Sequence, residues 1–322
     1  MNPPLAAFII PVLNGEKYIA RCLTSILNQC LPSEQLEVLV VDNGSTDRTQ
    51  NIVRDLGFSI EVIPGVTVAA LRNRGAEVAR GNYLAFVDAD VELETTWLRN
   101  GLAAFEDERV VAAGCFPKVP EPATWVQRAW DMHQRGNQWK GEPKPIAWLP
   151  SMNLLVRRDA FVKMGGFNAQ LETAEDVDLC YRLGRYGTIL CNPYMEATHW
   201  GEAADLRSFW RKEAWRGTDN FKGTLAHGFR WDEVPSVGYP IYIFCLTLIL
   251  SFGCGFDLWN QRFTLTLPSL GLLTLPALLL AITTMRRARQ PSALPGLFLL
   301  YLTYGFARAY SMVSAGLYRR AS

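Results

Sequence analysis

Asp88 and Asp90 are the residues whose type and spacing most directly suggest chemistry. They stand two residues apart, directly after the apolar run 83–87, so both carboxylates can point to the same side of an extended chain. Paired carboxylates at the end of a strand suit a divalent cation, which prefers oxygen ligands. An isolated pair of this kind is more often a solvated turn, but here further polar clusters end neighbouring apolar runs. We therefore predict a cation-binding position.

The elements that must position this pair alternate along the first part of the chain. Apolar runs predict strands over 5–12, 36–41, 59–63 and 83–87, and amphipathic or capped segments predict helices over 16–29, after 42–47 and over 68–78. The helix after 42–47 has Ser45 or Thr46 as its expected N-cap. Strands that are apolar throughout and alternate with helices indicate a parallel sheet covered on both faces. Ligands bind beyond the carboxyl ends of such strands, where the polar clusters lie.

A second pair of acids, Glu175 and Asp176, opens a predicted helix over 175–186. A carboxylate within hydrogen-bond reach of a hydroxyl can take its proton. Acids are also favoured at this end of a helix by the helix dipole, and both interpretations can hold together. Before this helix, a segment rich in proline and tryptophan, 114–150, predicts an irregular excursion that is helical near 125–134. Flanking strands are expected over 153–157 and 188–191, and a short helix over 158–164.

The last third of the chain has the composition of a membrane region. The segments 234–256 and 263–285 each have 23 residues without a charge, and a spanning helix needs roughly 20 apolar residues. A third predicted helix, about 291–318, contains Arg308. It either spans, with Arg308 snorkelling, paired or facing protein, or it is interfacial or re-entrant. Arginines at 286, 287 and 289 follow the second of these segments. They predict that the loop after residue 285, and with it the N-terminal domain, is cytoplasmic.

A basic amphipathic segment, 205–217, precedes these helices. Leu206, Phe209, Trp210 and Ala214 share one helical face, and basic residues stand between them: Arg207, Arg211, Lys212 and Arg216. An aromatic face edged by basic residues suits a membrane interface with anionic head groups, and the alternative is a helix packed on the soluble domain. The arginines are also candidates for an acceptor's phosphate. The chain thus divides into a catalytic domain, 1–204, an interfacial region, 205–233, and a membrane region, 234–322.

Composition and missing motifs exclude several classes of protein. The net charge of +1 gives no reason to expect a nucleic-acid partner. Seven cysteines without a C-x-x-C pair argue against a zinc site and for buried, reduced thiols. No G-x-G-x-x-G follows a strand, which argues against a dinucleotide dehydrogenase. The turn at 14–16 also lacks the glycine-rich phosphate loop with arginine that a sugar nucleotidyltransferase needs.

Six segments, in this order and at these intervals, resemble the inverting nucleotide-sugar glycosyltransferases of family 2, in their membrane-anchored bacterial form. The resemblance covers about residues 8–217. Its carriers are Ile10-Pro11-Val12-Leu13-Asn14-Gly15-Glu16, Val40-Val41-Asp42-Asn43-Gly44-Ser45-Thr46-Asp47, Arg72-Asn73-Arg74-Gly75, Gly81-Asn82-Tyr83-Leu84-Ala85-Phe86-Val87-Asp88-Ala89-Asp90, Gly165-Gly166-Phe167 and Glu175-Asp176-Val177-Asp178-Leu179. The resemblance implies an α/β fold of the GT-A type, a mostly parallel sheet flanked by helices, followed here by transmembrane helices.

The resemblance also implies a role for each matching position. The nucleotide would be lined by Pro11, Val12, Asn14 and Glu16, with Asp42 on its base and Arg72 on the base or the diphosphate. Asp88 would contact the ribose or the metal-bound diphosphate, and Asp90 would ligate Mg²⁺ or Mn²⁺. His199 would complete the metal site, unless it is a packed or acceptor-side histidine. Asp176, with Glu175 as the alternate, would be the catalytic base. The family often has a second acid where this chain has Asn43.

The chemistry expected from these roles is transfer of one sugar from a nucleotide-sugar donor to an acceptor hydroxyl, with inversion. A metal would stabilise the leaving diphosphate as a Lewis acid. An anchored enzyme at the inner membrane favours a lipid-linked glycan or glycolipid as acceptor, as in cell-envelope polysaccharide synthesis. The alternatives are a non-catalytic membrane-anchored binder of nucleotide sugars and a processive polysaccharide synthase. The segment 215–217 lacks the Gln-x-x-Arg-Trp element of processive synthases, which favours a single transfer.

Overall fold

The computed structural model describes residues 4–32, 35–136, 141–218, 234–261 and 263–318. The chain forms two compact units. Unit 1 comprises residues 1–121 and 138–202, and unit 2 comprises residues 122–137 and 203–322. The predicted division into 1–204, 205–233 and 234–322 did not assign residues 122–137 to the second unit, where the structure places them.

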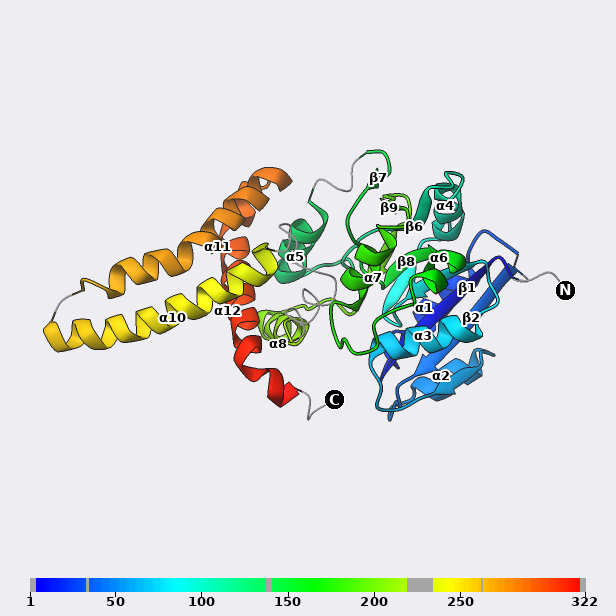
Figure 1. The fold of residues 1–322 in the computed structure, drawn as a ribbon, viewed down its shortest axis with the longest axis horizontal. Coiled ribbons are helices and arrows are strands. Elements are labelled where there is room, and N and C mark those ends of the chain that lie inside the picture. The colour runs from blue at the N-terminus through cyan, green and yellow to red at the C-terminus, as the bar shows by residue number, and fades with distance from the viewer. Residues whose placement is uncertain (1–3, 33–34, 137–140, 219–233, 262, 319–322) are drawn as a thin grey trace. The chain divides into compact units, whose positions relative to one another are not determined.

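Unit 1 is built on an eight-stranded sheet (Figure 1). The strand order is β3 (Ile60–Val62), β2 (Leu36–Asp42), β1 (Ala6–Val12), β4 (Tyr83–Val87), β8 (Asn153–Arg157), β6 (Val110–Gly114), β9 (Thr188–Cys191) and β7 (Lys144–Pro145). The first four strands are parallel, and β8 runs antiparallel to both of its neighbours. The mostly parallel α/β sheet predicted from the alternating pattern is thereby confirmed.

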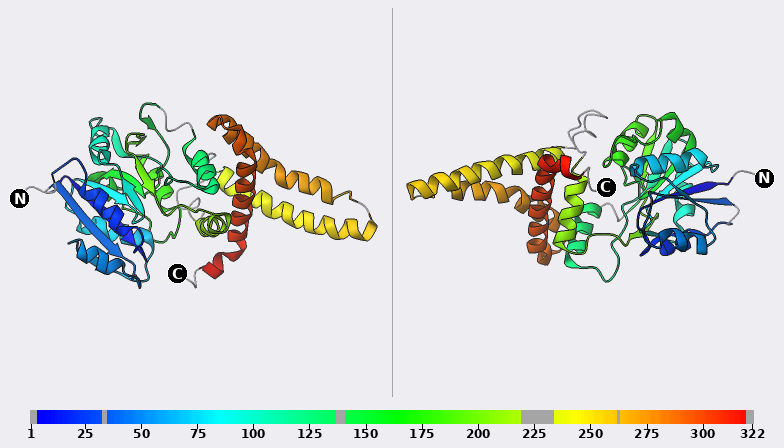
Figure 2. Two further views of the ribbon diagram at one scale, coloured as in Figure 1. Left: turned by 180° about the vertical axis from the view of Figure 1, so that it is seen from behind. Right: turned by 90° about the horizontal axis from the view of Figure 1, so that it is seen from below.

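Helices cover both faces of this sheet (Figure 2). They are α1 (Ile19–Leu27), α2 (Thr49–Asp55), α3 (Val68–Val78), α4 (Trp97–Ala104), α6 (Arg158–Lys163) and α7 (Glu175–Leu183). All seven residues of β1 are buried, as expected for a central strand between two helical layers. Helix α3 lies so close to β1 that a Cβ at Gly75 would be 2.4 Å from Ile9 Cγ2, so only glycine permits this packing.

The strand register brings three polar loops to one edge of the sheet. Val12 pairs with Asp42 where β1 and β2 end, and β4, whose next residue is Asp88, lies on the other side of β1. A two-stranded ribbon then follows Asp90, in which β5 (Val91–Leu93) pairs with β10 (Ala197–His199) and Val91 is opposite His199. The ribbon was not predicted, because strands of three residues are too short to show a period.

Three local predictions are corrected by the structure. Helix α2 begins at Thr49 with Arg48 as its N-cap, so Ser45 and Thr46 are not caps; the Ser45 hydroxyl is bound to Asp42 instead. Helix α7 ends at Leu183, three residues early. All seven cysteines are free thiols, but Cys30 and Cys245 are exposed, because one lies in a turn after α1 and the other on the outer side of a long apolar helix.

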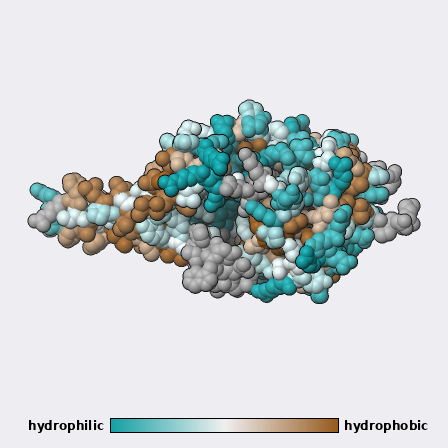
Figure 3. Space-filling model, turned by 90° about the horizontal axis from the view of Figure 1, so that it is seen from above, coloured by the Kyte–Doolittle hydropathy of each residue, from teal (hydrophilic) through white to brown (hydrophobic). Residues whose placement is uncertain are grey.

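Unit 2 is helical. It contains α5 (Trp125–Arg135), α8 (Leu206–Arg216), α10 (Val234–Asn260), α11 (Thr266–Ala288), the 3₁₀ turn η3 (Pro291–Ala293) and α12 (Leu294–Tyr318). Among the described residues, two helices are long and apolar enough to cross a membrane, Ser236–Asn260 and Thr266–Ala288. Apolar side chains gather along this α10–α11 pair (Figure 3). These are the first two predicted spans; α12 does not meet the same criterion.

Candidate active site

The loop after β1 and the loop after β2 form one hydrogen-bonded structure. Asn14 has φ of 52°, and its backbone N–H donates to Ser45 Oγ over 2.8 Å. Asn14 Oδ1 in turn accepts from the Thr46 N–H at 2.9 Å. The Glu16 carboxylate accepts from Arg48 at 3.1 Å through the backbone N–H. Of the predicted nucleotide-lining residues, Asn14 and Glu16 therefore belong to this loop pair, and Pro11 and Val12 end the strand β1 that leads into it beside Asp42.

Asp42 lies inside this loop pair rather than on its surface. Its side chain is fully buried, and its carboxylate accepts hydrogen bonds from the Ser45 N–H at 2.9 Å and from Gln50 Nε2 at 2.8 Å. A contact between Asp42 and a nucleotide base would require Ser45 or Gln50 to give way. The predicted role in binding the base stays a prediction, and the observed role is to shape the loop.

Arg72 links the end of β4 to the start of α7. Its Nη2 lies 2.7 Å from Asp88 Oδ1, and its Nη1 lies 2.7 Å from Glu175 Oε1. The guanidinium is only 3% exposed, and its planar fork suits two carboxylates at once. Acids 87 residues apart in the sequence are thus held at one place. Arg72 was predicted to reach the nucleotide, but in the structure its guanidinium is directed at these two acids.

The two acids at the start of α7, Glu175 and Asp176, have raised pKa values. Burial raises the pKa of Glu175 to about 7, with the charge of Asp176 adding to the effect and Arg72 opposing it. Burial also raises the pKa of Asp176, against the opposing charge of Arg72 and a hydrogen bond from the Val177 N–H. A carboxylate whose pKa moves toward neutrality is a better proton acceptor at neutral pH. The predicted role of Asp176, or of Glu175, as the catalytic base stays a prediction.

Asp90 and His199 meet beside the β5–β10 ribbon. His199 Nε2 is 3.2 Å from Asp90 Oδ2, and His199 Nδ1 is 3.1 Å from Glu202 Oε2. His199 and Glu202 are both buried. A Cβ at Gly201 would lie 1.9 Å from Asp90 Oδ2, so glycine is required for Asp90 to occupy this position.

The donor set of Asp90 and His199 fits a divalent cation in part. A carboxylate oxygen and an imidazole nitrogen are ligands of Mn²⁺ and related ions, and Mg²⁺ binds through one or two carboxylates plus phosphates and water. Within the described ranges, no group of three or more His, Cys, Asp or Glu side chains is arranged to hold a metal. The predicted trio of Asp88, Asp90 and His199 is therefore not arranged as a three-ligand site, and Asp88 Oδ1 is paired with Arg72.

Glu202 is a site residue that the sequence reasoning missed. It follows His199 by three residues and holds the ring nitrogen on the side away from Asp90. Ligating histidines commonly donate their second N–H to a carboxylate, which fixes the tautomer and the ring orientation. Its position three residues after a candidate metal-binding histidine was the feature of the sequence that could have identified it.

Comparison with known proteins finds similarity to one family. Residues 7–165 match the model of the family described as "Glycosyl transferase family 2". This segment, about half of the chain, is similar to glycosyltransferase family 2. The segment contains Asp42, Arg72, Asp88 and Asp90, whereas Asp176 and His199 lie beyond its end. The assignment of those two residues therefore depends on the contacts described above.

Curated proteins that are similar to this chain carry transferase names. It is 32% identical over 183 residues to "Glycosyltransferase AglE" of Haloferax volcanii, which covers 54% of this chain and 59% of the relative. It is 27% identical over 220 residues to "Validoxylamine A glucosyltransferase" of Streptomyces hygroscopicus subsp. limoneus, covering 57% and 49%. The chain thus spans about half to three fifths of the length of these relatives.

Solved structures share the fold of this chain, which is of the GT-A type. A mannosyltransferase from Pyrobaculum calidifontis in complex with GDP-Man and Mn²⁺ has a TM-score of 0.61 at 17% identity, with 98% of this chain and 88% of that chain covered. TarS of S. aureus in complex with UDP has a TM-score of 0.53 at 17% identity, covering 99% and 92%. At this identity the likeness shows the fold alone.

Proposed function

We propose that this protein moves one sugar from a nucleotide-sugar donor to an acceptor hydroxyl, in a metal-dependent single displacement with inversion. The observation that carries the proposal is the Arg72 bridge, which holds Asp88 and Glu175, the neighbour of Asp176, together at the edge of the sheet. The similarity to family 2 and the buried, proton-attracting acids support the same reading. A binder without catalysis would need no such base.

Each group has one task in this mechanism. Asp90 and His199 would hold Mg²⁺ or Mn²⁺, which when bound stabilises the negative charge of the leaving diphosphate. Asp176 accepts the proton of the acceptor hydroxyl as that oxygen attacks the sugar. Asp88 orients the ribose or the diphosphate, and the loops at 11–16 and 42–47 enclose the nucleotide. Arg72 keeps the donor-side and acceptor-side acids in a fixed relation.

The acceptor that fits best is lipid-linked. Helices α10 and α11 have the length and composition of a membrane anchor, and an anchored enzyme shares one surface with a lipid-linked glycan or a glycolipid. Arginines at 286, 287 and 289 follow α11 and favour the cytoplasmic face of the inner membrane for the catalytic domain.

The direct test is a donor screen with the full-length protein in liposomes that contain a lipid-linked acceptor extract. Release of nucleoside diphosphate is measured for UDP-, GDP- and dTDP-sugars, with Mn²⁺, with Mg²⁺ and with EDTA. We expect one donor class to be consumed, with the rate lost in EDTA. Tight binding of a donor without release under any condition would instead identify a non-catalytic binder.

Glu202 is expected to control the affinity for the metal through His199. Loss of such a supporting carboxylate typically weakens metal binding about 10–100-fold, so we expect this from Glu202→Ala and a smaller effect from Glu202→Gln, whose amide oxygen still accepts from Nδ1. Binding of Mn²⁺ in the presence of nucleoside diphosphate, followed by electron paramagnetic resonance, measures the effect. Asp90→Ala sets the lower limit and Glu196→Gln, an acid paired with Lys118 in the same strand region, is the control.

The raised pKa values predict how activity depends on pH. The base must be ionised, so turnover is expected to fall as the pH is lowered through the pKa of the Glu175–Asp176 pair, where Glu175 titrates at about 7. Glu175→Gln removes one member of the pair, so this acid limb should move to lower pH. A profile of kcat that stays flat from pH 5 to 8 would contradict the assignment of these acids as the base.

A further inference from the structure

The contacts of α12 with the α10–α11 hairpin are confined to one end of the hairpin. One apolar cluster joins Ala277 and Ala281 of α11 to Leu297 and Leu300 of α12, and another joins Ile243 of α10 to the later turns of α12. The distal halves of both hairpin helices carry exposed apolar side chains instead, such as Phe252 at 70% and Trp259 at 89%. A third span of 25 residues would pack along the hairpin, whereas α12 runs across its end (Figures 1 and 2).

A buried ion cluster ties the middle of α12 to α8. The carboxylate of Glu213 is fully buried, with Oε2 at 2.9 Å from Arg308 Nη2 and Oε1 at 2.6 Å from Arg216 Nη1. The charges of Arg308 and Arg216 hold the pKa of Glu213 below its usual value, against the effect of burial. Pairing was one of the arrangements that the sequence analysis allowed for Arg308, and the structure shows it. Arg216, which was a candidate for binding an acceptor's phosphate, contacts Glu213 instead.

The outer face of α8 carries the remaining basic residues. Phe209 and Ala214 are buried, with the Phe209 ring 5.1 Å from Trp130 of α5, so the aromatic face predicted to lie on a membrane is packed inside unit 2. The exposed stripe consists instead of Arg207, Arg211 and Trp215. If α12 crossed a bilayer, the contact between Glu213 and Arg308 would place α8 beside the middle of α12. Arg207 and Arg211 would then lie in the hydrocarbon region, where charged groups are costly.

The outer face of α12 is apolar and adjoins this basic stripe. Leu299, Tyr310 and Val313 are 44%, 41% and 64% exposed and recur at helical spacing. The Tyr310 ring is 6.1 Å from that of Trp210 on α8. Apolar, aromatic and basic side chains thus follow one another across the α8–α12 pair. At the surface of a bilayer these three kinds of side chain match the acyl chains, the interface and the lipid phosphates, in that order.

We propose that α12 does not span the membrane but lies along its surface with α8, and that Arg207 and Arg211 bind the phosphates of anionic phospholipids. The partner is the bilayer itself, because the same unit provides an apolar hairpin to enter it. Arginines at 286, 287 and 289 stand at the end of α11, before α12 in the chain, and this proposal places them at the level of the head groups. This inference rests on the membrane association proposed above.

Spin labels at three depths test the orientation of α12. Single cysteines replace Leu299, Phe306 and Val313 in the full-length protein, with Cys30, Cys245 and Cys254 replaced, and a second set replaces Ile241, Phe252 and Trp259 of α10. Seven residues of a helix normal to the bilayer differ in depth by roughly 10 Å. We expect equal depths along α12, whereas along α10 residue 259 is expected to be clearly shallower than residue 252. If residue 306 is the deepest label on α12, the helix spans the bilayer and this inference is wrong, while the proposed membrane anchor stands. If the depths are equal along α10 as well as along α12, the proposed anchor is also wrong.

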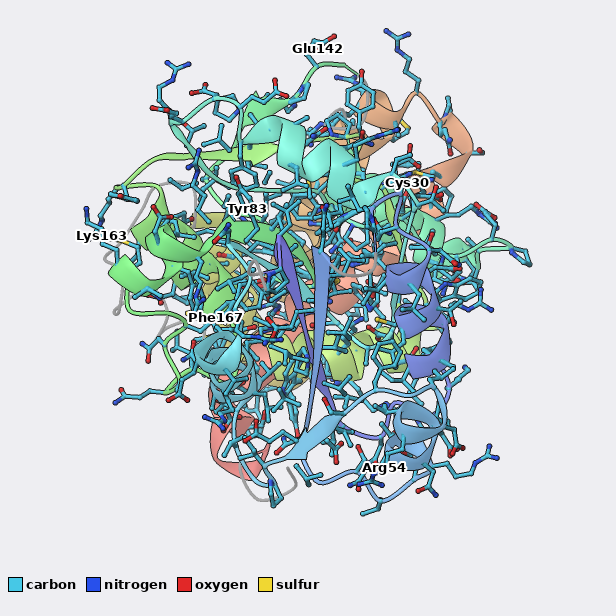
Figure 4. All side chains as sticks on the ribbon, turned by 90° about the vertical axis from the view of Figure 1, so that its right-hand side faces the viewer. Cys30, Arg54, Tyr83, Glu142, Lys163 and Phe167 are labelled. Atoms are coloured by element: carbon cyan, nitrogen blue, oxygen red, sulfur yellow. The ribbon has the colours of Figure 1, made fainter. Side chains whose placement is uncertain are left out.

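The lipid contact is tested with Arg207→Gln/Arg211→Gln. The protein is extracted from vesicles of phosphatidylcholine and phosphatidylglycerol, and the lipids that remain bound are quantified. We expect the preference for phosphatidylglycerol to fall roughly fivefold for each arginine removed. The control is Arg54→Gln/Arg99→Gln, which removes the same charge from exposed positions of unit 1; Arg54 lies on α2 at the surface (Figure 4). Equal losses in the two double variants, or no loss in either, would overturn the assignment of α8.

Discussion

Replacement of Asp176 by asparagine is expected to lower turnover about 10²–10⁴-fold, the range that a positioned general base contributes, without changing the affinity for the donor. Asparagine keeps the size of the side chain and still accepts the hydrogen bond from the Val177 N–H. The amide cannot take a proton from the acceptor. Single-turnover rates together with calorimetry of donor binding separate the two quantities.

Asp159→Asn is the matched control for this variant. Asp159 also stands in the first turn of a helix and accepts a backbone hydrogen bond from its neighbour, Ala160, but it is exposed and no contact places it with the acids of the site. Its substitution is expected to leave turnover unchanged. Wild-type turnover in Asp176→Asn would remove Asp176 from the mechanism and make Glu175 the candidate base.

Replacement of Arg72 by methionine is expected to open the site, because it leaves Glu175 without its buried partner. Removal of one member of a buried ion pair costs about 3–5 kcal/mol. Asp88 is 27% exposed in its side chain, so water compensates it in part, and most of the loss should appear in α7. Hydrogen exchange of the α7 and β4 amides in the full-length protein measures the local stability, and donor turnover should be lost with it.

Two further variants make the Arg72 prediction specific. Arg74 lies on the same helix and also contacts two acids, Glu61 and Glu77, but its side chain is 38% exposed. Exposed ion pairs contribute up to about 1 kcal/mol, so Arg74→Met should have little effect. Adding Glu175→Gln to Arg72→Met removes the unpaired charge and should restore much of the α7 protection. Equal effects of the Arg72 and Arg74 substitutions would contradict the proposed bridge.

The strands that carry the site were predictable because they are apolar throughout and end in polar turns. The segments 83–87, 153–157 and 188–191 form strands with the predicted bounds, and the loops at 14–16, 42–47 and 88–90 meet as expected. The ribbon of β5 and β10 was not predictable, because each strand has three residues and its partner is about a hundred residues away. That ribbon is what brings His199 to Asp90.

Side-chain partners were harder to predict than backbone positions. The pattern around Arg72 indicated a functional arginine, but only the packing of α3 against β1 determines that its guanidinium reaches both Asp88 and Glu175. Amphipathicity showed correctly that one face of 205–217 is apolar. It did not show what covers that face, since α5 and α12 come from distant segments of the chain, and Glu213 meets Arg308 across 95 residues.

The configuration of the product at the anomeric carbon tests the central claim most directly. With the donor identified by the screen, the full-length protein transfers its sugar to the lipid-linked acceptor, and nuclear magnetic resonance of the purified product gives the anomeric configuration. A single displacement, with Asp176 acting on the acceptor hydroxyl, predicts a configuration opposite to that of the donor. A product that retains the donor's configuration would contradict it.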